Sequence, residues 1–184
     1  AHAFCICHRF HTMDQILLKM LKDSNNLYAE AMFYQIAASS GCKQASARQA
    51  RAIIKRLVQK LGFNPDQYSF ADGSGLSLYN YVTAELEVAF LRYAVKTGNI
   101  LLHLKPSMPI AATDGTLADR MRGTFTNGNV YAKTGTLTGV SALSGYCTAA
   151  NGHRLAFAIM NQGLKHTRNG RAFQDKVCVE LCRP

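Results

Sequence analysis

Apolar residues in the first half of the chain recur at spacings of three and four, which places them on one face of an α-helix. The pattern predicts helices over residues 13–23, 27–38, 46–61 and 83–96. Ser46 and Thr83 stand where the third and fourth helices begin, and their hydroxyls are suited to accept a hydrogen bond from a first-turn N–H. The first half of the chain is therefore expected to be helical.

The pattern changes after residue 128, where shorter apolar stretches predict strands. The strands are expected over 130–133, 141–149 and 155–160, with a last helix over 172–182. Asn151-Gly152 is typical of a tight hairpin turn before the third strand. Residues 105–129 are expected to be mostly irregular because Pro and Gly interrupt them. Helices followed by a short antiparallel sheet and one helix indicate an α/β protein of the α+β type rather than a parallel βαβ sheet.

Composition narrows the class of protein. Of the 184 residues 48% are apolar, which excludes a disordered tail, and the longest apolar runs are far too short to span a bilayer. The net charge of +10 predicts an anionic partner: nucleic acid, an acidic membrane surface or a carboxylate-bearing substrate. No acidic residue lies between Asp119 and Asp175, so a free peptide carboxylate would be drawn to that stretch. Its basic residues are Arg120, Arg122, Lys133, Arg154, Lys165, Arg168 and Arg171.

Ser24-Asn25-Asn26 forms an S-x-N motif at the turn between the first two predicted helices. Acyl transfer needs a nucleophile, a path for the proton and donors for the developing oxyanion. The hydroxyl of Ser24 is suited to relay a proton to a leaving amine, and the amide of Asn26 can hold a substrate amide. These two residues are therefore candidate catalytic residues.

Lys133-Thr134-Gly135 forms a K-T-G motif on the first predicted strand. Lys133 supplies a positive charge near the proton relay and is the third candidate catalytic residue. Thr134 adds a hydroxyl donor, and Gly135 lets a substrate backbone approach the strand edge closely. The backbone N–H of Thr136 is a candidate oxyanion donor, so Thr134, Gly135 and Thr136 are the expected substrate-binding residues.

Four sequence segments that occur in a fixed order indicate a family more specifically than the two short motifs do. They are LLKMLKDSNNLYAEAMF, ADGSGLSLYN, DGTLADRM and AKTGTLTGVSALSGY. From about Gln15 to its end, the chain resembles the C-terminal part of the D-alanyl-D-alanine carboxypeptidase/endopeptidase family, the class C low-molecular-mass penicillin-binding proteins (serine peptidase family S13). The resemblance implies a DD-peptidase/β-lactamase-like fold with an incomplete antiparallel sheet. Residues 1–184 would form the C-terminal part of the DD-peptidase domain, with residues 1–12 unmatched, as a truncation or frame scar.

The family's nucleophile is the serine of an S-x-x-K motif that precedes S-x-N. No serine precedes Ser24 here. Ser40-Gly41-Cys42-Lys43 fits the string but follows S-x-N, and Gly is a poor residue near the start of a helix. We therefore expect Ser40 to be a decoy, the N-terminal part of the protein to supply the nucleophile, and this chain alone to be inactive.

The resemblance also implies the partners: peptidoglycan stem peptides ending in D-Ala-D-Ala, and β-lactams, with no cofactor. It implies a periplasmic or extracellular protein. One alternative is a non-catalytic module that binds peptidoglycan or penicillin without cleaving it. A serine β-lactamase relative ranks lower, because no deacylating glutamate can be assigned; Glu30 follows S-x-N but is expected on a helix surface.

Two further hypotheses have less support in the sequence. A basic nucleic-acid-binding protein would use a stripe of basic residues on the third predicted helix. We interpret this stripe as a solvated helix face, because no recognition motif accompanies it. The stripe consists of Arg48, Arg51, Lys55, Arg56 and Lys60. A metal site at Cys5, Cys7, His8 and His11 is not expected, because the spacing leaves no turn long enough to wrap an ion. Cys178 and Cys182, four apart on the last helix, are expected to be buried thiols.

Overall fold

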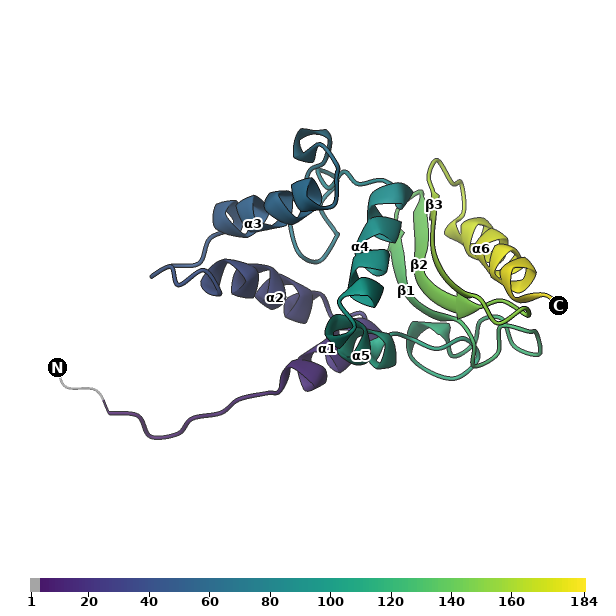
Figure 1. The fold of residues 1–184 in the computed structure, drawn as a ribbon, viewed down its shortest axis with the longest axis horizontal. Helices are drawn as coiled ribbons and strands as arrows, with labels where there is room; N and C mark the ends of the chain where they lie inside the picture. Colours follow the sequence, from purple (N-terminus) through teal and green to yellow (C-terminus); the bar gives the residue numbers. More distant parts are fainter. Residues whose placement is uncertain (1–3) are drawn as a thin grey trace.

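The computed structural model describes residues 4–184, which form six α-helices, two short 3₁₀ segments and three strands (Figure 1). The helices are α1 (Met13–Lys22), α2 (Asn26–Ala38), α3 (Ala47–Lys60), α4 (Ala84–Lys96), α5 (Asn99–Ser107) and α6 (Thr167–Cys182). The strands are β1 (Tyr131–Leu137), β2 (Val140–Thr148) and β3 (Arg154–Asn161), and the 3₁₀ segments are η1 (Pro65–Gln67) and η2 (Gly115–Leu117).

The helices in the first half begin at polar caps. The predicted caps are confirmed, because the Ser46 hydroxyl accepts from the N–H of Gln49 and the Thr83 hydroxyl from that of Leu86. Asn25, the middle residue of the S-x-N motif, caps α2 by accepting a hydrogen bond from Tyr28 N–H at 3.1 Å. A local signal thus fixes the direction in which α2 leaves the turn that holds the motif.

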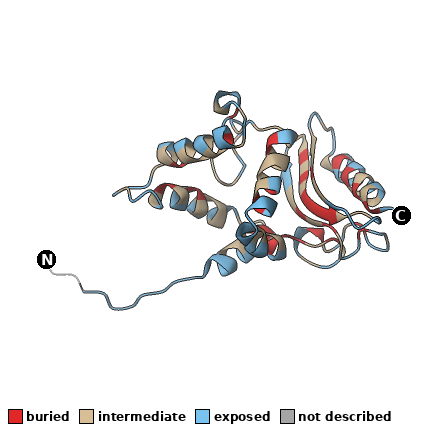
Figure 2. Cartoon of the chain, in the orientation of Figure 1, coloured by how far each residue is buried: buried red, intermediate tan, exposed pale blue. Residues whose placement is uncertain are grey.

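The three strands form one antiparallel sheet in the order β1-β2-β3, with helices on both faces. Helix α4 covers one face and α6 the other, while α2 and α3 form a separate pair of helices away from the sheet (Figure 1). The largest cluster of buried residues in the described part of the chain lies between the sheet and α6 (Figure 2). Cys178 and Cys182 lie in that core as buried free thiols, as predicted, and Cys147 of β2 joins them.

Close contact between β1 and β2 depends on Gly145. A Cβ there would lie 2.6 Å from Ala132 Cα and would also collide with the carbonyl oxygen of Tyr131. The two strands can therefore pack at this point only because position 145 has no side chain.

One expectation for the connecting segments is wrong. Helix α5 was not predicted, and it ends inside the segment expected to be irregular; Leu101 and Leu104 pack against a buried cluster, which outweighs the proline in its last turn. The predicted hairpin turn at Asn151-Gly152 is confirmed: residues 149–153 join the antiparallel strands β2 and β3, and Gly152 has a φ of 82°. The N–H of Ala149 and the carbonyl of His153 close that loop at 2.9 Å. The last helix also begins five residues earlier than expected, at Thr167.

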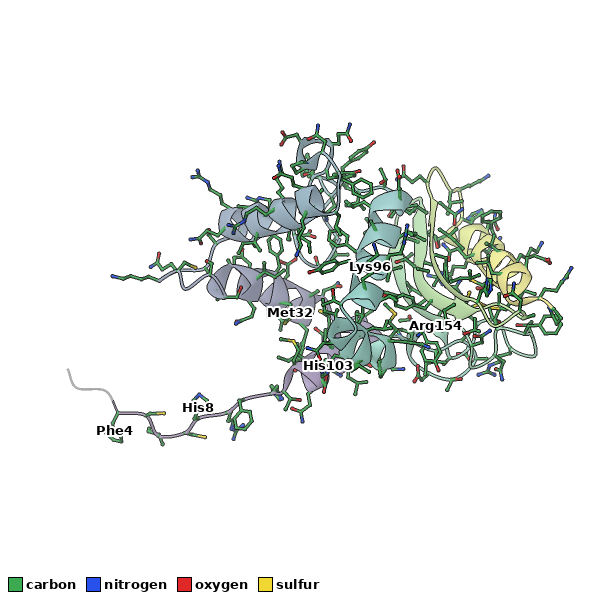
Figure 3. All side chains as sticks on the ribbon, in the orientation of Figure 1. Phe4, His8, Met32, Lys96, His103 and Arg154 are labelled. Carbon is green, nitrogen blue, oxygen red and sulfur yellow. The ribbon has the colours of Figure 1, made fainter. Side chains whose placement is uncertain are left out.

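The described N-terminal residues 4–12 run as an extended, exposed stretch away from the helices (Figure 3). The side chains of Phe4 and His8 project from it. Residues 1–3, which belong to the segment expected not to match the family, lie outside the described residues. Within residues 4–184, no three His, Cys, Asp or Glu side chains gather as a set of metal ligands. In the same range no helix combines the length and the hydropathy needed to cross a bilayer.

Candidate active site

The structure brings all the predicted site residues to one cavity of about 920 Å³. Its walls come from the α1–α2 turn, the loop between η1 and α4, strand β1 and the start of α6. The predicted residues in its lining are Ser24, Asn26, Lys133, Thr134, Gly135 and Thr136. A cavity of this size is typical of a small-molecule or peptide site.

Ser24 and Lys133 form the central contact of the cavity. Ser24 holds a left-handed backbone conformation, with φ of 54°, at the turn between α1 and α2. This conformation is unusual for a non-glycine residue and is often found at functional sites. The Nζ of Lys133 donates to the Ser24 Oγ at 2.7 Å and to the carbonyl oxygen of Thr134 at 2.6 Å.

The ammonium group of Lys133 loses its proton more readily in this site than it would in water. Burial lowers the pKa of its ammonium group below the ordinary value of 10.5. None of the ion pairs among residues 4–184 includes Lys133. Its charge is therefore compensated by oxygen dipoles alone and stays available to an anionic ligand.

The K-T-G segment lies on a strand edge that faces the cavity. Strand β1 pairs with β2 on one side, and in the described chain its outer edge pairs only at Tyr131, through a single bridge to Ile110. Thr134 Oγ1 donates to Thr116 Oγ1 at 2.9 Å. At Gly135 a Cβ would meet only Ala142 Cβ at 3.5 Å, so the fold does not require glycine there and the space belongs to the cavity. A free strand edge of this kind can bind an extended peptide by adding it as a further strand.

Residues 72–77, the D-G-S-G-L-S part of the second of the four sequence segments, form a hydrogen-bonded loop that lines another wall of the cavity. Both carboxylate oxygens of Asp72 accept hydrogen bonds, from the N–H groups of Gly75 and Ser77 at 2.7 Å and from the amide of Asn80 at 2.9 Å. Burial alone would raise the pKa of Asp72, but these hydrogen bonds outweigh it and lower the pKa below 3.8. The loop is therefore held in shape before any ligand binds.

Glu30 has a role that its predicted position on a helix surface does not account for. Its Oε1 accepts from the N–H groups of Gly73 at 3.2 Å and Ser74 at 3.0 Å, so α2 is tied to the loop. The expectation of a surface glutamate is therefore wrong. No periodicity could have found this contact, because its partners lie more than forty residues away along the chain.

Glu87 is a cavity residue that the sequence analysis did not single out. It lies in the first half of α4, and burial raises its pKa while a hydrogen bond with Ser144 opposes the rise. Ser144 on β2 is the register partner of Lys133 on the neighbouring strand β1. The sequence could have pointed to Glu87 by its position. It lies three residues before Phe90, on the helix face where apolar residues were expected.

Ser40 lies away from the cavity. It follows α2, and its hydroxyl donates to the carbonyl of Ala37 at 2.7 Å. The length of α2 puts Ser40 about 20 Å from the S-x-N turn, at 1.5 Å per helical residue. The hydroxyl of Ser40 is thus engaged in ending a helix, and Ser40 is absent from the cavity lining.

Comparison with known proteins agrees with this geometry. Residues 4–181 match the D-Ala-D-Ala carboxypeptidase 3 (S13) family. The chain belongs to this family. The match begins at residue 4 and so includes most of the segment that the sequence analysis left outside the resemblance.

Individual relatives are similar over most of this chain. The D-alanyl-D-alanine carboxypeptidase of Actinomadura sp. is 37% identical over 181 residues, covering 95% of this chain and 32% of that protein. The D-alanyl-D-alanine carboxypeptidase DacB of Haemophilus influenzae is 36% identical over 152 residues, covering 82% of this chain and 32% of that protein. The chain therefore spans about a third of the length of these relatives.

Solved structures confirm the expected fold class. Penicillin binding protein 4 of Haemophilus influenzae, in complex with a β-lactam, matches with a TM-score of 0.79 and 32% identity, covering 92% of this chain and 41% of that one. The TLA-3 extended-spectrum β-lactamase matches with a TM-score of 0.64 at 18% identity, which shows a shared fold alone. The S13 chain thus has the DD-peptidase/β-lactamase-like fold.

Proposed function

We propose that this chain belongs to a serine-type D-Ala-D-Ala carboxypeptidase/endopeptidase acting on peptidoglycan stem peptides, and that it supplies the proton relay and the substrate-binding strand. The single observation that carries the proposal is the hydrogen bond from Lys133 to Ser24, beside a free strand edge. The two relatives named as D-alanyl-D-alanine carboxypeptidases support the reaction class.

In the proposed reaction, a serine from another segment of the protein attacks the carbonyl of the penultimate D-Ala. The C–N bond breaks, D-Ala leaves, and water then hydrolyses the acyl-enzyme. Ser24 passes its hydroxyl proton to the leaving amine and takes up in exchange the proton that the attacking serine gives up, so that the proton is relayed; because Lys133 donates to the Ser24 oxygen, the Ser24 hydroxyl hydrogen remains free to be passed on. Lys133 keeps this hydroxyl in position.

The remaining residues would hold the substrate. The amide of Asn26 binds a substrate amide, the backbone N–H of Thr136 stabilises the oxyanion, and the edge of β1 at Gly135 pairs with the substrate backbone. A β-lactam would occupy the same positions and acylate the same serine. Because the substrate lies outside the cytoplasmic membrane, we further propose a periplasmic or extracellular location.

The nucleophile is proposed to lie outside this sequence, because Ser40 donates its hydroxyl to Ala37 and does not line the cavity. The test is to incubate the full-length protein and this chain with a fluorescent penicillin and separate them under denaturing conditions. We expect a covalent band for the full-length protein and none for the chain.

Two results would contradict the proposal in different ways. A band on the chain that Ser40→Ala abolishes would assign the nucleophile to Ser40. A full-length protein that forms no band and releases no D-Ala, but sediments with peptidoglycan, would be the non-catalytic module considered above.

A further inference from the structure

A second cavity, of about 340 Å³, lies at the other end of the sheet from the candidate active site. Its walls come from the end of α4, from α5, and from the ends of β2 and β3 that meet at the hairpin. The two cavities share no lining residue. Along β2 the active-site cavity reaches Ala142 and the second cavity begins at Tyr146, about 13 Å further along the strand. A small ligand in the second cavity would therefore not touch Ser24 or Lys133.

Part of the lining is apolar and well fixed. Tyr146 of β2 and Ala156 of β3 are register partners, and they pack with Leu101 of α5 in one hydrophobic cluster. The Tyr146 hydroxyl donates to the carbonyl oxygen of Leu91 at 2.8 Å, which holds the tyrosine ring against α4. The volume suits a small ligand. The cavity can therefore take up a compact apolar group.

The charged residues of the lining are all basic: Arg92, Lys96, Lys105 and Arg154. None of the ion pairs among residues 4–184 includes any of them. Arg92 and Lys96 lie one turn apart on α4, where like charges repel each other. The Lys105 Nζ lies 4.4 Å from the centre of the Tyr131 ring, which compensates its charge only in part. Lys96 of α4 and Arg154 of β3 can be followed in Figure 3.

The other titratable groups of the lining add no negative charge. Burial raises the pKa of the Tyr146 hydroxyl to about 12, and it also raises the pKa of the Cys147 thiol to about 12. Both groups are therefore neutral at neutral pH. The lining has four positive charges without a counter-charge, an arrangement that costs stability until an anion neutralises it.

We propose that this cavity is a second binding site, for an organic anion that carries a phosphate group on a compact apolar group, such as an aryl phosphate monoester. Arginine binds phosphate through paired N–H donors, and lysine adds a compact positive charge. The long, exposed side chains of Arg92, Lys96 and Arg154 can reach over the phosphate while the apolar lining receives the rest of the ligand. The site is separate from the proposed hydrolase site, and the inference does not depend on that activity.

The test measures binding of naphthyl phosphate to the full-length protein by isothermal titration calorimetry and by thermal unfolding. Inorganic phosphate and naphthol are titrated in parallel, because each carries only one half of the proposed ligand. We expect naphthyl phosphate to bind about tenfold more tightly than either compound and to raise the Tm. Added salt should weaken its binding, because the contacts are between charges close to solvent.

Charge-removing variants locate the binding. Lys96→Met and Arg154→Met retain most of the apolar side chain, and each should weaken binding about tenfold or more. Neither should lower the Tm of the unliganded protein, because each relieves repulsion. Lys176→Met and Arg56→Met are the matched controls, since both cations are exposed and line neither cavity, and they should leave the affinity unchanged. Lys133→Met, in the active-site cavity, should also leave it unchanged.

Three results would overturn the inference. The first is that the full-length protein does not bind naphthyl phosphate more tightly than inorganic phosphate or naphthol. The second is binding that Lys133→Met weakens and that Lys96→Met and Arg154→Met do not. The third is sedimentation with anionic phospholipid vesicles that Lys96→Met and Arg154→Met abolish, without binding of naphthyl phosphate, which would assign these cations to a membrane surface instead.

Discussion

The Nζ of Lys133 donates a hydrogen bond of 2.7 Å to the Oγ of Ser24, although the two residues are 109 positions apart in the chain. One side chain comes from the middle of β1 and the other from the turn between α1 and α2. The contact joins the sheet to the helical part of the molecule in the lining of the cavity. It also makes the proposed proton relay sensitive to either residue.

Ser24→Ala should lower the rate of D-Ala release by the full-length protein by about 10²- to 10⁴-fold, because it removes the hydroxyl that passes the proton. Ser24→Gly should lose as much activity but be more stable than Ser24→Ala by about 1 kcal/mol, since glycine adopts a positive φ without strain. Steady-state kinetics and thermal unfolding check the two effects separately. A Ser24→Gly protein with wild-type turnover would exclude Ser24 as the relay.

Two glycine substitutions in neighbouring strands should have opposite effects. Gly135→Ala should change the free energy of unfolding by no more than about 0.5 kcal/mol but lower kcat/KM about tenfold or more, because the methyl group projects from the sheet face into the cavity, beside the edge proposed for the substrate backbone. Gly145→Ala should cost about 2–3 kcal/mol, because its Cβ would collide with the backbone of β1. Denaturant unfolding and D-Ala release measure the two properties. Normal activity in a folded Gly135→Ala protein would count against β1 as the substrate-binding strand.

Glu30→Ala should destabilise the protein by about 1–3 kcal/mol, because the N–H groups of Gly73 and Ser74 lose their acceptor. Glu30→Gln retains an acceptor oxygen and should lose less. Glu85→Ala is the matched control at an exposed glutamate and should stay within about 0.5 kcal/mol. Urea midpoints measured in parallel decide the result, and equal midpoints for the Glu30 and Glu85 variants would contradict the loop contact.

Glu87 should make stability depend on pH above the ordinary pKa of a glutamate. Burial raises its pKa in the folded state, so between the unfolded and folded values the native protein binds more protons than the unfolded chain. Stability should therefore fall as pH rises through that window. Glu87→Gln should remove this decline, while Glu85→Gln should retain it. Denaturation curves from about pH 4 to pH 8 test this, and parallel profiles for wild type and Glu87→Gln would refute it.

The chain's local signals were sufficient to predict much of its secondary structure. Ser46 and Thr83 marked helix starts correctly, because a capping hydrogen bond joins residues only three apart. The first strand was predicted in the right place but too short, because its predicted range of 130–133 stops four residues before the end of β1 at Leu137. The buried face of α6 with Cys178 and Cys182 was predicted from helical spacing. Helix α5 was missed because its stability comes from packing of Leu101 and Leu104 on distant residues, which no local pattern records.

The sequence by itself determined the chemical groups of the site, the order of the elements except α5, and the resemblance to the S13 family. Only the tertiary structure decided which of those groups meet. It brought Lys133 to Ser24, tied Glu30 to the D-G-S-G-L-S loop, and set Arg171 beside Thr136 while Asp175 neutralised Arg120. The physical reason is range: caps and periodicity act within a few residues, whereas these contacts depend on how helices and sheet pack across the whole chain.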